Sequence, residues 1–237
     1  MNRYSAALAL MSDVAMGTMG GDLKRRERIS ARLGDMLSML YLTSSVLKRF
    51  NDDGRPAQDL PLVQWACEDN MYKAQVALDE MLDNFPNRIV GSVLGKLLFP
   101  WGRTLRKPSD QLDHQVSRIM QTPCEARSRL ATNVYLTLEP NNQIGLIEKA
   151  LTDILAAEPI FDKVVHAANK RLPFFRLHEV AALGLELGVI TEAEAEKLRV
   201  AEQGRLHTIN VDDFDPLELA ADKSLFDKKP KAKSVAA

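Results

Sequence analysis

Residues 22–50, DLKRRERISARLGDMLSMLYLTSSVLKRF, decide the fold class of this chain. Their apolar side chains recur at alternating intervals of four and three residues, at Ile29, Leu33, Met36, Leu40, Thr43, Leu47 and Phe50. That spacing places them on one face of a helix, the pattern of a helix that packs in a bundle. Residues 51–56 combine turn formers with a proline, so the helix is expected to end there.

The same period returns further along the chain. A second helix is expected over residues 61–84, with Pro61 in its first turn and Met71, Ala74, Leu78, Met81 and Phe85 on one face. A third carries Ile144, Ile147, Leu151 and Ile154 and is interrupted or kinked at Pro159.

Residues 177–209 read as a helical hairpin. Gly188 is placed to stop the first helix, and Thr191 with Glu194 predicts a capping box at the start of the second. Residues 133–137 are the one β-like patch, where a frayed helix end is an equal alternative. The sequence therefore predicts an all-α fold of helical bundles.

The loop 102–108 is the best internal boundary. It predicts an N-terminal helical bundle over residues 1–103 and a C-terminal bundle over 104–221 that contains the hairpin. Since the predicted helices of both halves carry continuous apolar faces, one fused all-α domain is the alternative to two bundles. Residues 222–237 turn to Lys, Asp, Ser and Ala, and are expected to form a disordered tail.

A dense basic cluster lies at the start of residues 22–50. It comprises Lys24, Arg25, Arg26, Arg28 and Arg32. Asp22 can cap a helix here, and cations are disfavoured in a first helical turn because the macrodipole is already positive there. The cluster therefore suggests an anionic partner, such as acidic side chains, a phosphate or an anionic membrane surface. The alternative is a solvated charged face.

Composition excludes several classes. The chain has 31 basic and 32 acidic residues among 237, for a formal net charge of −1, which argues against a nucleic-acid partner. Two cysteines, Cys67 and Cys124, are too few and too far apart for a disulfide framework or a zinc site. No apolar run reaches the length of a membrane span, and Asp13 breaks the apolar stretch near the N-terminus. We expect a cytoplasmic protein.

Residues suited to catalysis do not converge in the sequence. The four histidines, His114, His166, His178 and His207, fall on separate predicted helices without a metal-binding partner at helical spacing. Gly17, Gly20 and Gly21 follow no strand, so they do not form a phosphate-binding loop. Asp212, Asp213 and Asp215 lack the spacing of an EF-hand. We expect no catalytic, cofactor-binding or metal-binding residue in this chain.

Residues 88–99 form an unusual predicted helix. About half of its circumference is apolar, through Ile89, Val90, Val93, Leu94, Leu97 and Leu98, and Trp101 follows its end. At 1.5 Å per residue it is about 18 Å long, too short to cross a bilayer. Basic residues flank it, as in helices that lie in a membrane surface. The alternative is a core helix whose Gly91, Ser92 and Gly95 allow close approach to a neighbour.

Several long strings resemble one enzyme family. They are LPLVQW at 60–65, NFPNRIV at 84–90, FPWGR at 99–103, PSDQLDH at 108–114 and RLHTINVDDFDP at 205–216. In this order they resemble the C-terminal region of the bacterial long-chain acyl-CoA dehydrogenases of fatty-acid β-oxidation, the large form with a helical extension. The resemblance runs over residues 4–219.

The resemblance implies one part of an FAD-dependent enzyme that converts long-chain acyl-CoA to trans-2-enoyl-CoA. In that family a glutamate removes the α-proton while FAD accepts the β-hydride, and no motif here matches the segment that carries the base. The chain alone is therefore expected to be inactive and to bind no FAD. It would act as a structural extension that docks on the catalytic domains, with peripheral contact to the inner membrane as a further option. The alternative is a stand-alone, non-enzymatic helical interaction or membrane-surface module.

Overall fold

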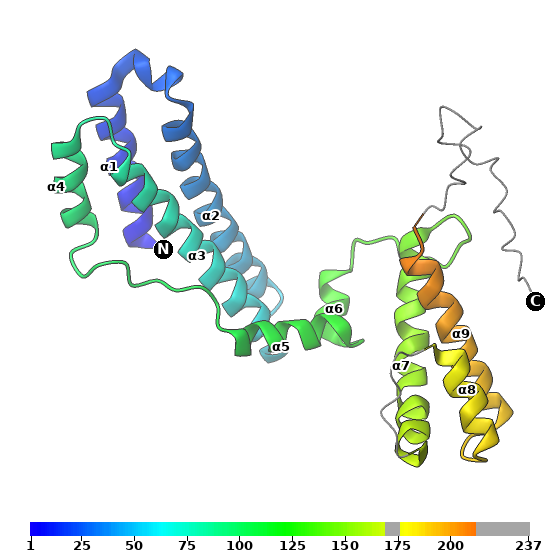
Figure 1. The fold of residues 1–237 in the computed structure, drawn as a ribbon. Coiled ribbons are helices and arrows are strands. Elements are labelled where there is room, and N and C mark those ends of the chain that lie inside the picture. The colour runs from blue at the N-terminus through cyan, green and yellow to red at the C-terminus, as the bar shows by residue number, and fades with distance from the viewer. Residues whose placement is uncertain (169–175, 212–237) are drawn as a thin grey trace, which may run out of the picture. The chain divides into compact units, whose positions relative to one another are not determined.

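The computed structural model describes residues 1–168 and 176–211, and these residues form helices and connecting loops without a strand. The predicted all-α fold class is confirmed. Residues 133–137 are turn and coil, so they form neither the strand nor the helix end that the sequence left as alternatives. The contacts within the chain define two units, Met1–Asn133 and Val134–Ala237, which we call unit 1 and unit 2 (Figure 1).

This division differs from the predicted boundary at 102–108. Residues beyond that loop remain attached to unit 1, because the indole of Trp65 donates to Asp113 and the guanidinium of Arg129 bonds Asp59 at 2.6 Å. These two contacts join residues 48 and 70 positions apart, so no local sequence pattern predicts them. The predicted tail 222–237 lies outside the described residues.

Unit 1 is built on a long helical pair. Its helices are α1 (Asn2–Met19), α2 (Glu27–Asp52), α3 (Leu60–Asp83), α4 (Arg88–Leu98), α5 (Asp110–Gln121) and α6 (Glu125–Leu130), with the 3₁₀ turns η1 (Gly20–Arg25) and η2 (Ala57–Asp59). Figure 1 shows α1 and α4 beside the same end of the α2 and α3 pair. The fully buried centre is Met11, Met36, Leu78 and Met81. Long, flexible methionines fill such irregular spaces between helices.

The predicted face of α2 drifts along the helix. Ile29, Met36, Leu40 and Thr43 are buried, but Leu47 is 43% exposed. A straight α-helix turns away from a strict seven-residue repeat by about 20° per heptad, so the predicted seam leaves the core by the last turns. Val46, which is not on the predicted face, lines the groove towards α3 there together with Phe50, which is on that face.

In its described residues, unit 2 is an assembly of the helices α7 (Gln143–Ala168), α8 (Leu177–Glu186) and α9 (Glu192–Ile209). The hairpin prediction is confirmed in its details. Gly188 has a φ of 64°, and Thr191 and Glu194 form both hydrogen bonds of a capping box. Helix α7 runs on through Pro159.

The predicted apolar face of α7 is wrong at its start. Ile144 and Ile147 are half exposed, whereas Gly145, Ala150, Ala157, Ile160 and Val164 are buried. The reason is close packing of α9. A side chain added at Gly204 would place its Cβ 3.2 Å from the Cβ of Ala150. Small residues therefore define the contact between these helices, and the larger isoleucines are left outside.

Candidate functional site

The basic cluster does not begin α2 as the sequence suggested. Residues 20–25 form the 3₁₀ turn η1, and α2 starts at Glu27 with Arg26 as its N-cap and no side-chain cap. Asp22 therefore does not cap the helix. The glycine pair permits this tighter turn, since Gly20 adopts a φ of 53°. Of the predicted basic residues only Arg28 lies in the first turn of α2, beside Glu27.

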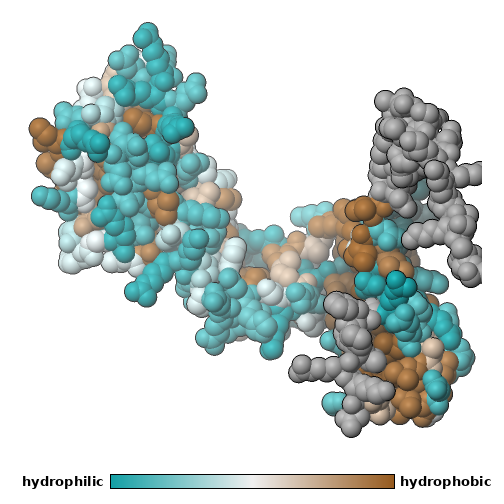
Figure 2. All heavy atoms as spheres, in the orientation of Figure 1, coloured by the Kyte–Doolittle hydropathy of each residue, from teal (hydrophilic) through white to brown (hydrophobic). Residues whose placement is uncertain are grey.

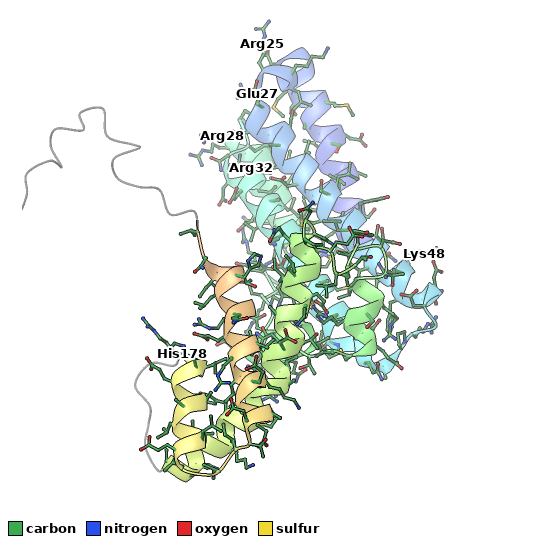
Figure 3. All side chains as sticks on the ribbon, turned by 90° about the vertical axis from the view of Figure 1, so that its right-hand side faces the viewer. Arg25, Glu27, Arg28, Arg32, Lys48 and His178 are labelled. Atoms are coloured by element: carbon green, nitrogen blue, oxygen red, sulfur yellow. The ribbon has the colours of Figure 1, made fainter. Side chains whose placement is uncertain are left out.

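The arginines of the cluster, but not Lys24, line an open groove of about 430 Å³. Its walls are Arg25, Arg26, Glu27, Arg28, Ile29, Arg32 and Asn84. Figure 3 shows the side chains of Arg25, Arg28 and Arg32 following one another from the end of η1 into the start of α2. Asn84 comes from the end of α3, where the helix dipole adds negative potential and favours nearby cations.

Part of this positive charge is neutralised within the chain. Arg32 bonds Glu80 on α3 at 3.2 Å, and its side chain is only 17% exposed. Arg25 lies 3.9 Å from Asp22, but both side chains are largely exposed, so that pair contributes little. Within the described residues, Lys24, Arg26 and Arg28 form no ion pair. These three cations are the ones left for an outside anion.

Helix α4 presents two different faces. Asn87 caps it by accepting from the N–H groups of Ile89 and Val90. On the inner face Leu94 and Gly91 are buried, and Val90 and Leu98 are half-buried against the core of unit 1. On the outer face Ile89 is 77%, Val93 60% and Leu97 63% exposed. Figure 2 shows hydrophobic atoms at the edge of unit 1 on the side where Figure 1 places α4.

Trp101 is an exposed aromatic residue three positions after the end of α4. The four residues Ile89, Val93, Leu97 and Trp101, spaced four apart, form what we call the α4 stripe. The Trp101 ring is 79% exposed and lies under the guanidinium of Arg3, 5.6 Å from the ring centroid. Arg3 also donates to the carbonyl of Leu98. The stripe therefore ends at an aromatic ring held by a cation from α1, a contact that residue spacing alone did not reveal.

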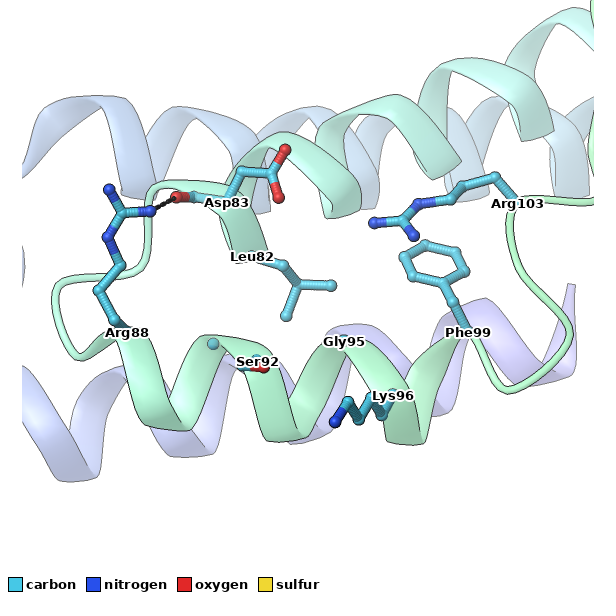
Figure 4. Close-up of a pocket in the computed structure, with 9 residues that line it drawn as sticks. Leu82, Asp83, Arg88, Ser92, Gly95, Lys96, Phe99 and Arg103 are labelled. Carbon is cyan, nitrogen blue, oxygen red and sulfur yellow. Dashed lines mark hydrogen bonds between the residues drawn. The ribbon is translucent and has the colours of Figure 1, made fainter.

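A second groove, of about 340 Å³, separates α4 from the end of α3 (Figure 4). Leu82 and Phe99 supply its apolar surface, and Arg88, Lys96 and Arg103 supply positive charge. Arg103 bonds Asp79 and lies 4.9 Å from the centroid of the Phe99 ring, while Arg88 donates to the carbonyl of Asp83 at 3.4 Å. The hydrogen bond to Asp79 raises the pKa of Arg103 further. Because Asp83 lines the groove as well, its rim carries charges of both signs, with cations in excess, around an apolar floor.

No set of catalytic groups converges in the described part of the chain. His114, His166, His178 and His207 are exposed on four different helices. No group of three metal-binding side chains lies together among the described residues. Cys67 and Cys124 are free and half-buried, and burial raises the pKa of the Cys67 thiol, which lowers its reactivity. Asp212, Asp213 and Asp215 lie outside the described residues.

Comparison with known families decides what kind of protein carries these surfaces. The family described as acyl-CoA dehydrogenase, C-terminal, bacterial type matches residues 1–214. The chain belongs to this family. No solved structure matches it. The predicted resemblance to the C-terminal region of an acyl-CoA dehydrogenase is confirmed.

Acyl-CoA dehydrogenases are in general FAD-dependent oxidoreductases. Among the described side chains, no buried nitrogen or oxygen lacks a hydrogen-bond partner. We assign no flavin contact to the described residues. In the described residues no helix is long and apolar enough to cross a membrane.

Proposed function

We propose that this chain is the C-terminal helical part of an FAD-dependent long-chain acyl-CoA dehydrogenase of β-oxidation. Its role there is to dock on the catalytic domains, which supply the base and hold FAD and the acyl-CoA. The family match supports the enzyme class. The long-chain substrate rests on the sequence strings that resemble the large bacterial enzymes, and the cytoplasmic location that we propose rests on the apolar pattern of the sequence.

The α4 stripe is the observation that carries the docking role. Its residues Ile89, Val93 and Leu97 lie on the outside of a helix whose inner side packs through the buried Leu94. Exposed apolar side chains in a row mark interaction sites, because each gains roughly 1.5–3 kcal/mol when a partner buries it. The basic groove at Arg26 and Arg28 would add contacts to acidic side chains of the same catalytic domains.

The test measures, by calorimetry, the affinity of the chain for the separately expressed catalytic domains of a bacterial long-chain acyl-CoA dehydrogenase. Leu97→Asp should reduce affinity at least tenfold while leaving the unfolding midpoint of the chain unchanged, because Leu97 is exposed. Ile147→Asp, at another exposed apolar position, is the control and should bind normally. Equal affinity of the Leu97 variant and the control would remove the α4 stripe from the docking surface.

Inactivity of the chain alone is a separate part of the proposal. The purified chain should show no flavin absorbance and should not oxidise palmitoyl-CoA with a dye acceptor. A yellow protein, or turnover by the chain alone, would contradict the assignment of flavin and base to the other domains.

A membrane-surface role is the second candidate, and the ends of the α4 stripe favour it. Trp101 and the nearby cations Arg3 and Lys96 match the aromatic and basic border of an interfacial helix. Wild-type chain should then sediment with vesicles that contain anionic lipid, and Leu97→Asp should abolish this. If the chain binds the catalytic domains but not vesicles, the docking role stands alone.

A further inference from the structure

The groove between α4 and the end of α3 contains two cations without a carboxylate partner (Figure 4). Its charged lining residues are Arg88, Lys96, Arg103 and Asp83. Arg103 is balanced, because it bonds Asp79 and the charge of Asp83 acts on it as well. Within the described residues Lys96 forms no ion pair, and Arg88 donates only to the carbonyl of Asp83, at 3.4 Å. An anion in the groove would therefore meet two cations that no carboxylate neutralises.

Ser92 lies midway between these two cations on α4. Arg88, Ser92 and Lys96 are four residues apart, so they project from successive turns on one side of the helix. Figure 4 shows the Lys96 side chain running back along α4 towards Ser92, and the Asp83 carboxylate on the α3 side of the groove. The Ser92 hydroxyl is exposed and makes no hydrogen bond within the described residues. A hydroxyl between a guanidinium and an ammonium suits a phosphate, which offers three acceptor oxygens and close to two negative charges.

The guanidinium of Arg103 is a platform at the other end of the groove. It lies over the Phe99 ring, 4.9 Å from the ring centroid, and hydrogen bonds to Asp79 fix its orientation. A planar guanidinium stacks on aromatic faces, so the side of Arg103 that faces away from Phe99 can take a second ring. Figure 4 shows Leu82 between this end and Arg88. One end of the groove therefore suits a phosphate, and the other end suits an aromatic ring.

Gly95 leaves the space between the two ends open. It lines the groove between Ser92 and Phe99, in the interior of α4, where glycine is a poor helix former. A Cβ added there would meet no atom within 4 Å, so packing inside the chain does not require a glycine at this position. The groove has a volume of about 340 Å³, and small-molecule sites occupy roughly 300–1,000 Å³. The open space is therefore large enough for a small ligand.

We propose that this groove binds a small, soluble phosphate monoester that carries an aromatic ring. The phosphate is held by the Ser92 hydroxyl and the Lys96 ammonium, and the exposed Arg88 side chain turns towards it. The ring stacks on Arg103 and contacts Leu82. The ligand binds the chain itself, so the site does not depend on the proposed docking on catalytic domains, and its tests use the chain without them.

The first experiment measures the affinity of the whole chain for phenyl phosphate by calorimetry. Phenyl phosphate should bind at least tenfold more tightly than inorganic phosphate, which lacks the ring. It should also bind at least tenfold more tightly than benzoate, which has the ring but only one negative charge. Absence of phenyl phosphate binding, or a preference below threefold over either reference anion, would overturn the proposal.

The second experiment uses variants to locate the ligand. Ser92→Ala and Lys96→Gln should each weaken phenyl phosphate binding at least fivefold, and Gly95→Leu should abolish it by filling the groove. None should lower the unfolding midpoint, because Ser92 and Lys96 are exposed and a side chain at Gly95 has room. Arg118→Gln and Gly34→Leu are the matched controls, at an exposed cation of α5 and an open helical glycine of α2, and both should bind normally. Binding by Gly95→Leu at the affinity of its Gly34 control would place the ligand elsewhere and overturn the proposal.

Discussion

The side-chain amide of Gln75 and the backbone of Leu105 pair through two hydrogen bonds. Gln75 Oε1 accepts from the Leu105 N–H and Gln75 Nε2 donates to the Leu105 carbonyl, both at 3.1 Å. The Tyr4 hydroxyl donates to the same Oε1 at 3.2 Å. Gln75 is 4% exposed, so one buried amide joins α1, α3 and the segment that follows α4. It thereby anchors the loop that carries Trp101.

Replacing Gln75 should destabilise unit 1. Gln75→Leu leaves the N–H and carbonyl of Leu105 without partners, which costs about 1–3 kcal/mol for buried groups. Urea unfolding followed by tryptophan fluorescence reports on this unit, because Trp65 and Trp101 both lie in it. Gln64→Leu, at an exposed position of the same helix, should shift the midpoint little. An equal effect of both changes would show that the pairing with Leu105 is not stabilising.

Two glycines of α4 should respond in opposite directions to alanine. At Gly91 an added Cβ would lie 2.7 Å from the Leu82 carbonyl oxygen, so Gly91→Ala forces α4 away from α3 and should cost about 1–3 kcal/mol. At Gly95 the added Cβ meets nothing within 4 Å, so Gly95→Ala should stabilise the helix by roughly 0.5–1 kcal/mol. The same fluorescence-detected unfolding compares them. Similar shifts for both variants would contradict the close contact of α4 and α3.

The basic groove predicts salt-dependent association with the catalytic domains. Arg25→Glu combined with Arg28→Glu should weaken binding several-fold at low salt, and the difference from wild type should shrink as salt screens the charges. Arg118→Glu on α5, to be compared with Arg28→Glu alone, is a control of equal charge change at an exposed position that forms no ion pair in the described residues. Unchanged association of the double variant at low salt would favour the solvated charged face.

The sequence could predict structural features that depend only on residues close together in the chain. The capping box of Thr191 and Glu194 and the left-handed Gly188 each need only a few adjacent residues. Asp22 shows the limit of this logic. It is a good cap in isolation, but Gly20 allowed the chain to form a 3₁₀ turn first, so α2 begins five residues later.

Features set by distant contacts could not be predicted. The spacing of residues 88–99 revealed an apolar half-circumference, but only the position of α3 and the core decides that Leu94 is inside and Leu97 outside. The basic cluster was visible as a run of cations. That Arg32 would pair with Glu80 while Arg26 and Arg28 stayed unpaired depends on how α2 and α3 lie against each other.

Glu202 should make the stability of unit 2 depend on pH. This α9 side chain is 4% exposed and accepts hydrogen bonds from Arg205 at 2.9 and 3.0 Å. These bonds, with the charge of Arg205 and a bond from the Leu177 N–H, hold the pKa of Glu202 below its usual value, against the opposing effect of burial. The pKa of Glu194 is lowered as well, first by the Thr191 N–H of the capping box.

The sign follows from these lowered pKa values. A carboxyl whose pKa is lower in the folded than in the unfolded state contributes stability that is fully present above its unfolded pKa, near about 4.3 for glutamate, and is lost as the pH falls through the folded pKa. Unit 2 should therefore lose stability as the pH falls below that unfolded pKa. Glu202→Gln should be less stable than wild type at neutral pH, and the stabilities of the two proteins should converge at acid pH.

Circular dichroism follows the whole chain during urea unfolding, and tryptophan fluorescence identifies the part of the transition that belongs to unit 1. Glu196→Gln, at an exposed position of the same helix, is the control. A constant difference between wild type and Glu202→Gln at every pH would mean that the charge of Glu202 does not stabilise the fold.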